Sequence, residues 1–120
     1  MVKLRLEWSE VFTLEVSNVT AHAPMSAGVY RLSCQKNDER IVFYVGQAEI
    51  LYERLRDHVL AEESNDCIRS NLGGYSCYFR FAMVDRQSDR DCAERVLYDH
   101  FQPECNVEVP PGEPGDINFV

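Results

Sequence analysis

The chain has 120 residues, of which 45% are hydrophobic, and a formal net charge of −8 at pH 7. This length suits one compact domain and excludes a substrate cleft between two domains. The charge excludes binding of nucleic acid by bulk attraction, although residues 1–96 hold 15 acidic and 12 basic residues and leave room for a local basic groove.

The first half of the chain predicts a pair of strands. Residues 11–16 (VFTLEV) are compatible with an earlier strand, followed by a loop from Ser17 to Pro24. The segments from Gly28 to Cys34 (GVYRLSC) and from Ile41 to Val45 (IVFYV) are rich in β-branched and aromatic residues, as is typical of strands. Since only the short polar segment Gln35 to Arg40 separates them, we expect an antiparallel hairpin.

The second half predicts two helices on either side of a third strand. Apolar residues recur at helical spacing from Glu49 to about Glu63. A loop from Ser64 to Gly74 then leads to a strand from Tyr75 to Val84. Ser88 is expected to cap a second helix, which ends at about Phe101.

The order strand, strand, helix, strand, helix predicts an α/β fold. We expect a compact layered domain over residues 1–107, with a three-stranded antiparallel sheet flanked by helices. Residues 108–120 contain three prolines, two glycines, three acidic residues and no basic residue. They predict a loosely held acidic tail without regular structure, which could dock on a basic protein partner.

The cysteines and the N-terminal segment indicate which cellular compartment to expect for this protein. The five cysteines are Cys34, Cys67, Cys77, Cys92 and Cys105, an odd number without a C-x-x-C pair. We therefore expect small apolar core residues in a reducing cytosol, and neither a disulfide framework nor a four-cysteine zinc site. Lys3, Arg5 and Glu7 interrupt any signal peptide, and no apolar stretch approaches the ~18 residues of a membrane span, so we expect a cytoplasmic protein without membrane contact.

Three polar residues lie on the apolar sides of the predicted helices. Arg54 and His58 are four residues apart and share one side of the first helix, where each could be an ordinary boundary residue. Glu94 aligns with Phe101 on the apolar stripe of the second helix. A carboxylate at such a place is paired, protonated or bound to a cation, because burying it alone is costly. Its structural alternative is a salt bridge to Arg90, four residues earlier.

Two tyrosines lie close to glycines on the predicted hairpin. Gly28 precedes Tyr30 by two residues, and Gly46 follows Tyr44 by two residues. Glycine in a strand often marks a close approach of the backbone to another group. Each tyrosine alone could equally be an aromatic core residue.

Together these residues resemble the signature of the GIY-YIG nuclease superfamily. The segment Gly28-Val29-Tyr30 is followed after 13 residues by Tyr44-Val45-Gly46. The family has an arginine ten residues after the second tyrosine, often a histidine or tyrosine four residues later, and a helical glutamate with an asparagine twelve residues further on. The matching positions, over about residues 24–107, are Tyr30, Tyr44, Arg54, His58, Glu94 and Asn106.

The resemblance implies a small, stand-alone, divalent-metal-dependent endonuclease that acts on nucleic acid, with DNA the expected substrate. By the same resemblance Glu94 would bind a single Mg²⁺ or Mn²⁺ ion, and Tyr30 would be the general base. Arg54 could stabilise the phenolate of Tyr30 and hold the scissile phosphate. Tyr44 would position the water or the phosphate, His58 would relay a proton, and Asn106 would orient a loop.

Two alternatives remain open at this stage. One is a binding module that keeps this fold without cutting, which the acidic composition favours. The other is a protein-interaction domain that uses the acidic tail. The choice between DNA and RNA and the oligomeric state are also open.

Overall fold

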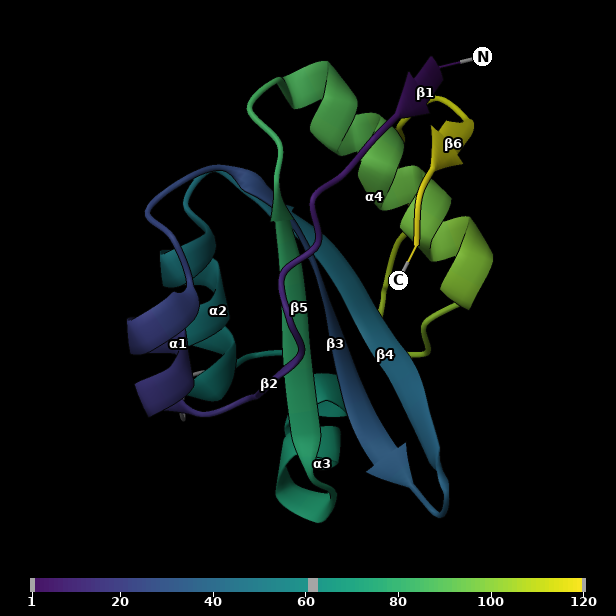
Figure 1. Ribbon diagram of the computed structural model, residues 1–120. Helices are drawn as coiled ribbons and strands as arrows, with labels where there is room; N and C mark the ends of the chain where they lie inside the picture. The colour runs from purple at the N-terminus through teal and green to yellow at the C-terminus, as the bar shows by residue number, and fades with distance from the viewer. Residues whose placement is uncertain (1, 61–62, 120) are drawn as a thin grey trace.

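The computed structural model describes residues 2–60 and 63–119 and is built on a four-stranded antiparallel sheet (Figure 1). The strand order is β2–β5–β3–β4, with β2 at Phe12–Thr13, β5 at Cys77–Met83, β3 at Gly28–Lys36 and β4 at Glu39–Ala48. The predicted α/β class is confirmed. The predicted three-stranded sheet is wrong, because β2 pairs with β5 as a fourth strand.

Helices cover both faces of this sheet (Figure 1). On one face lie α1 (Val16–His22), α2 (Leu51–Val59) and α3 (Asp66–Gly74), and on the other lies α4 (Gln87–Phe101). The core is accordingly divided into two clusters of buried side chains, one on each face. The first includes Val19, Leu51, Ile68 and Phe79, and the second includes Val29, Val45, Ala93 and Leu97.

The predicted hairpin is confirmed as β3 and β4. Asn37 in its turn has a φ of 57°, in the left-handed region that asparagine tolerates better than most residues. A register shift leaves Phe43 as an extra, bulged residue, and Tyr44 pairs with Leu32. Since Leu32 and Tyr30 share one face of β3, the bulge places Tyr44 on the same face as Tyr30.

Two helices occur where loops were predicted. The segment Ser17–Pro24 contains most of α1, and Ser64–Gly74 contains α3. Helix α1 is rich in weak helix formers, and the burial of Val19 against the core stabilises it instead. Helix α3 has a clear N-cap, because the Asn65 side chain accepts a hydrogen bond from the Ile68 N–H at 3.1 Å.

The other two helices were predicted with inexact ends. Helix α2 is shorter than the predicted range Glu49–Glu63, and α4 begins at Gln87 after Arg86 as N-cap, so the prediction of Ser88 as N-cap is wrong. Helix α4 ends at Phe101 as predicted. None of the helices within the described residues is long and apolar enough to cross a membrane.

The C-terminal segment packs on the domain, and the prediction of a tail without regular structure is wrong. Strand β6 (Gly115–Ile117) pairs in parallel with β1 (Val2–Leu4) beside α4 (Figure 1). The Asn118 side chain accepts from the Leu6 N–H and donates to the Leu6 carbonyl, at 2.6 and 2.8 Å. These hydrogen bonds and strand contacts offset the conformational entropy that the segment loses when it is ordered. The amino-acid composition of the segment does not reveal this pairing.

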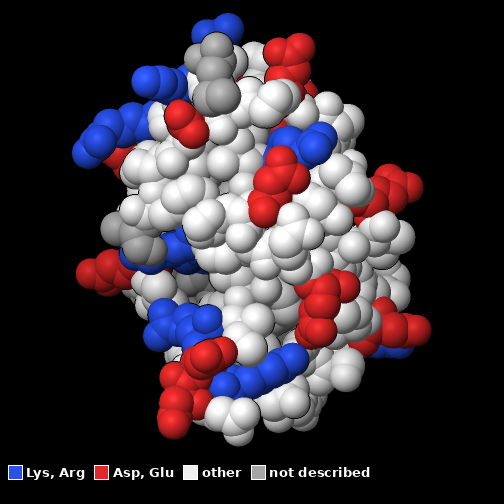
Figure 2. All heavy atoms as spheres, turned by 90° about the vertical axis from the view of Figure 1, so that its right-hand side faces the viewer, with Lys and Arg blue, Asp and Glu red and all other residues white. Residues whose placement is uncertain are grey.

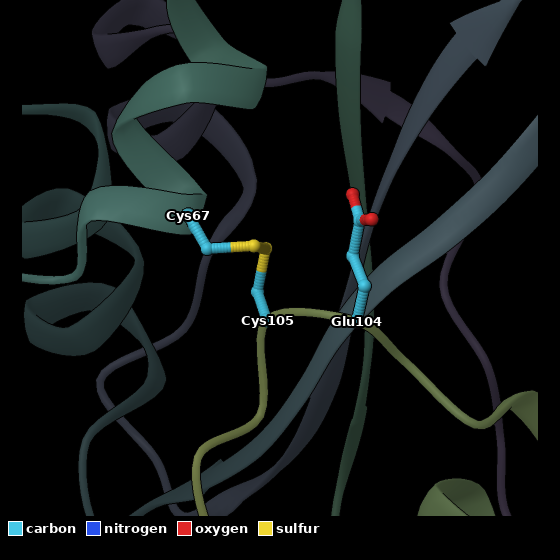
Figure 3. A group of neighbouring side chains, drawn as sticks. All are labelled: Cys67, Glu104 and Cys105. Atoms are coloured by element: carbon cyan, nitrogen blue, oxygen red, sulfur yellow. A yellow bond between two sulfur atoms is a disulfide. The ribbon is translucent and has the colours of Figure 1, made fainter.

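The expectation of five separate cysteines is wrong for one pair. Cys67 on α3 and Cys105 after α4 form a disulfide across 38 positions of the sequence (Figure 3). The sequence spacing of this pair matches no motif, and only the fold brings the two segments together. Cys34, Cys77 and Cys92 are free and buried, as small apolar residues would be.

Candidate active site

The glycines of the hairpin explain how Tyr30 fits into the sheet. Tyr30 pairs with Gly46 across β3 and β4. A Cβ atom on Gly46 would lie 2.6 Å from both the Cζ and the hydroxyl oxygen of Tyr30, so only glycine lets the ring lie across β4. Similarly, a Cβ on Gly28 would lie 2.2 Å from the carbonyl oxygen of Ala82 on β5. The glycines therefore serve the placement of Tyr30 and the packing of β3 on its neighbour.

His58 on α2 contacts both tyrosines. Its Nε2 lies 2.7 Å from the fully buried hydroxyl of Tyr30, and its ring centroid lies 5.3 Å from that of Tyr44. His58 is itself only 3% exposed, so it is not the boundary residue that its helix position allowed. A buried phenol and a buried imidazole in direct contact form a pair that can exchange a proton.

Arg54, one turn earlier on α2, is exposed but acts on both tyrosines. Burial strongly raises the pKa of Tyr30, and Tyr44 raises it further, whereas the Arg54 guanidinium lowers it by charge and hydrogen bonding. Burial also raises the pKa of Tyr44, and Arg54 again opposes this. Both hydroxyls therefore keep their protons at neutral pH, and Arg54 is the cation that favours their loss.

Glu94 approaches the same place from the other layer of the molecule. It lies on α4, which packs against β4, the edge strand of the sheet. Its carboxylate accepts a hydrogen bond at 3.0 Å from Gln47, which also donates to Asp91 at 2.8 Å. Burial raises the pKa of Glu94, the Gln47 hydrogen bond lowers it, and the Asp91 carboxylate raises it.

The structural alternative for Glu94, a salt bridge to Arg90, is wrong. Arg90 donates instead to the carbonyl oxygens of Val84 and Asp85 and to the side chain of Gln87, all at the start of α4. Within the described part of the chain, Glu94 forms no ion pair with any residue. A half-buried carboxylate beside a second carboxylate, with an amide as its hydrogen-bond donor, is an oxygen-donor arrangement that suits a hard cation.

Asn106 ties the segment after α4 to the edge strand. Its side-chain oxygen accepts from the Val45 N–H at 3.0 Å, and its amide donates to the Val45 carbonyl at 2.9 Å. Val45 is the residue after Tyr44, so these bonds fix the segment next to the Tyr44 ring. The paired geometry uses both ends of the amide, which the carboxylate of an aspartate could not do.

Two neighbouring cavities, which together are called the groove below, are lined by the two halves of this arrangement. A cavity of about 530 Å³ and a second of about 410 Å³ share Tyr44 and Asn65 in their walls. The first is lined by Arg54 and His58, and the second by Glu94. All six residues singled out in the sequence thus lie in or directly behind one groove, and they come from β3, β4, α2, α4 and the segment after α4.

Two residues at this groove, Gln47 and Glu63, were not predicted from the sequence. Gln47 immediately follows the Tyr44-Val45-Gly46 segment, and that position is the only sequence signal for its contact with Glu94. Glu63 contacts Nδ1 of His58, but it follows the end of α2 and no periodicity identifies it. Both were missed because hydrogen-bond partners depend on tertiary placement.

A different cluster also holds atoms that can ligate metals. The ligand atoms of Cys67, Glu104 and Cys105 all lie within 4.8 Å of one another (Figure 3). Both sulfur atoms belong to the disulfide, and the exposed Glu104 carboxylate accepts from Lys36 and Asn71. Because thiolates are the sulfur ligands of metals, the disulfide form of this cluster is a structural bridge.

The charged side chains on the face that contains α4 are mixed in sign. Figure 2 shows acidic and basic groups interspersed there, without a continuous basic patch on the visible face. The local basic groove that the composition allowed is therefore not on this face, where attraction of a polyanion depends on individual groups.

The fold as a whole is similar to solved structures of one domain. The N-terminal GIY-YIG endonuclease domain of UvrC from Thermotoga maritima, bound to its catalytic divalent cation, magnesium, matches with a TM-score of 0.59 at 20% identity, over 77% of this chain and 96% of that chain. A tyrosine-to-phenylalanine point mutant of it, bound to its catalytic divalent cation, matches with a TM-score of 0.59 at 19% identity, over 78% and 96%. No protein-family model and no curated protein sequence matches this chain. The chain therefore has a GIY-YIG-like fold.

Proposed function

We propose that this chain is a divalent-metal-dependent endonuclease that hydrolyses phosphodiester bonds in nucleic acid, with DNA as the expected substrate. The observation that carries the proposal is the convergence of a buried phenol–imidazole pair, a guanidinium and a half-buried carboxylate on one groove. The similar UvrC domain is an endonuclease domain with a catalytic divalent cation, which supports the same reaction here.

The donor set around Glu94 fits a hard divalent cation. Its carboxylate, oriented by Gln47 and close to the carboxylate of Asp91, would hold Mg²⁺ or Mn²⁺ together with waters and phosphate oxygens. When bound, the ion supplies Lewis-acid stabilisation of the leaving oxygen. A cation would also offset the repulsion between the two carboxylates, which raises the pKa of Glu94.

Tyr30 and His58 supply the path for the proton of the attacking water. The raised pKa of Tyr30 makes a standing phenolate unfavourable at neutral pH. Because the Tyr30 hydroxyl is fully buried in the free protein, we expect the attacking water to reach it only in the complex with substrate. There Tyr30 would take a proton from this water as its own proton moves to Nε2 of His58, 2.7 Å away. In this way the phenol acts as a general base without first being ionised.

The remaining groups position the substrate. Arg54 is exposed at the wall of the groove, where its guanidinium can hold two phosphate oxygens. Tyr44 lies between the two cavities and would orient the water or the phosphate through its hydroxyl. Asn106 would act through its two bonds to Val45, which hold the segment after α4 beside that ring.

A catalytically silent module remains the second candidate, because the chain carries a net charge of −8. A cleavage assay on plasmid, branched and single-stranded DNA and on single-stranded RNA, with Mg²⁺ or with a chelator, separates the two. Endonuclease activity predicts cleavage that requires the metal. An intact substrate panel in Mg²⁺ and Mn²⁺ would favour the silent module.

Glu94→Gln is the sharpest variant for this assay. The amide keeps the shape of the side chain, removes its charge and is a weaker ligand for a hard cation, so metal-dependent cleavage should be lost while the melting temperature stays the same or rises slightly. Glu53→Gln, on the exposed side of α2, is the matched control. A destabilised Glu94→Gln protein that still cuts would refute the assignment of Glu94 as metal ligand.

A further inference from the structure

Glu63 has a largely buried carboxylate, and the reaction proposed above assigns it no role. Its side chain is 9% exposed, and one carboxylate oxygen contacts Nδ1 of His58. The other oxygen accepts from the backbone N–H of Asn65 at 3.0 Å. Phenol, imidazole and carboxylate therefore form one continuous chain from Tyr30 through His58 to Glu63.

The chemistry of these contacts determines the tautomer of His58. An ionised carboxylate can only accept hydrogen bonds, so the His58 nitrogen that faces Glu63 must carry the hydrogen. In the neutral ring the opposite nitrogen, Nε2, is then the acceptor. Since Nε2 faces the hydroxyl of Tyr30, that hydroxyl must donate to it.

The structure holds Glu63 firmly in this position. Asn65, whose N–H binds Glu63, caps α3 through its side-chain oxygen and donates through its amide to the carbonyl of Cys105 at 3.0 Å. Cys105 is in turn bonded to Cys67 on α3. Glu63 is thus anchored next to the capped start of α3, which a hydrogen bond and a disulfide both tie to Cys105, as a group that orients another residue needs to be.

We propose that Glu63 is a positioning residue, which holds His58 in the tautomer protonated on Nδ1 and so leaves Nε2 free to take the proton of Tyr30. The inference rests on the proposed function for its catalytic meaning. The reaction then requires the Glu63 carboxylate as well. Without it His58 can adopt the opposite tautomer, in which Nε2 carries a hydrogen and cannot accept one.

The groups around His58 set the direction of the expected pH effect. Burial lowers the pKa of His58, Glu63 raises it, Arg54 lowers it and Asp57 raises it, while the two tyrosine rings from β3 and β4 are neutral. Removing the Glu63 charge should lower the pKa of His58. If cleavage needs neutral His58, activity is lost as the pH falls through that pKa. The acid limb, which is the low-pH side of the pH–activity profile, should therefore move to lower pH in Glu63→Gln.

A purely structural role for Glu63 predicts a different result. Such a role would consist of tying the segment after α2 to the helix, and its loss would lower stability and activity at every pH without moving the acid limb. Glu63→Asp keeps the charge with a shorter reach and should recover part of the activity and the wild-type limb. Glu53→Gln on the exposed side of α2 controls for the loss of one acidic charge.

The test has one arm on the free protein and one on the reaction. Nitrogen-15 NMR of the three histidines, assigned with His58→Gln, should show Nδ1 of His58 protonated and Nε2 unprotonated in the wild type, and mixed tautomers in Glu63→Gln. In the cleavage assay, kcat of Glu63→Gln should fall about 10- to 100-fold, by analogy with the loss of a hydrogen-bond partner from a metal-ligating histidine, with the acid limb of the pH profile at lower pH.

The failures are distinguishable. Protonated Nε2 in the wild type, or a cutting Glu63→Gln protein with an unchanged pH profile, would overturn the positioning role alone. A wild-type protein that cuts no substrate would overturn the proposed function and with it the part of Glu63 in a reaction.

Discussion

Gly46→Ala tests whether the placement of Tyr30 determines activity. The added Cβ would lie 2.6 Å from the Cζ and the hydroxyl oxygen of Tyr30. Two carbons in contact normally lie about 3.5–4.0 Å apart, so the ring must move by roughly 1 Å or the strands must separate. The ring is fully buried and its hydroxyl contacts His58, so neither movement is free.

The expected magnitudes follow from this overlap. Overpacking a filled core typically costs about 1–3 kcal/mol, and we expect a loss of stability in that range. A shift of roughly 1 Å would lengthen the 2.7 Å contact between Tyr30 and His58 beyond hydrogen-bonding distance. Misplacement of this size in a catalytic group can lower the rate about 100-fold.

Urea unfolding and the cleavage assay measure the two effects. Gly73→Ala on α3 is the matched control, because a Cβ there meets no atom within 4 Å and should leave stability equal or up to about 1 kcal/mol higher. In a Tyr30→Phe background one of the two close contacts is gone, so Gly46→Ala should cost less. A Gly46→Ala protein as stable and active as Gly73→Ala would refute the steric argument.

Three further changes probe the site and its supports. Arg54→Ala should lower cleavage about 100- to 1,000-fold with little change in the melting temperature, because an exposed phosphate clamp is removed; normal cleavage would exclude that role. Asn118→Ala should cost about 1–3 kcal/mol in unfolding experiments, since the N–H and carbonyl of Leu6 lose their partner; an unchanged midpoint would show that the C-terminal segment is loosely held after all. Replacing Cys67 and Cys105 by alanine should lower the unfolding free energy by about 2–4 kcal/mol, because the disulfide closes a loop across 38 positions; comparison with the wild type under reducing conditions checks whether the bond itself is responsible.

The hairpin and its site residues were predictable because their signals are local. Strand pairing over β3 and β4 follows from two apolar runs and a short polar turn. The close approach of Tyr30 requires a glycine at position 46, and the close approach of the Ala82 carbonyl requires one at position 28. Both steric requirements are visible in the sequence as glycines. Arg54 and His58 were placed on one side of a helix by their spacing alone.

The features that were missed depend on contacts between distant segments. Helix α1 is stabilised by the burial of Val19 rather than by helix propensity. The bond between Cys67 and Cys105 follows from the packing of α3 beside the segment after α4. Glu63 is functional only because the chain turns back after α2 and brings its carboxylate to His58. The local amino-acid composition does not predict contacts between segments that are far apart in the sequence.

The charge of the groove bears on how an acidic protein could hold a polyanion. Among the charged groups that the structure describes in the two cavity walls, Arg54 is the basic one, and the acidic ones are Asp57, Glu63, Glu94 and Glu108. A phosphate that enters this groove without a cation meets more repulsion than attraction. The divalent ion at Glu94 would therefore serve binding as well as chemistry.

This leads to a prediction for substrate affinity, measured with Tyr30→Phe to suppress cleavage. Fluorescence anisotropy with labelled DNA should show binding in Mg²⁺ and a large loss of affinity in chelator. Because Arg54 is the basic group available to contact phosphate in the groove, the affinity should fall only gently with monovalent salt, with a logarithmic slope of about −1 to −2. A slope steeper than about −5, or equally tight binding in chelator, would mean that the substrate lies on a basic surface elsewhere, and the groove between Arg54 and Glu94 would no longer be the place where nucleic acid is held.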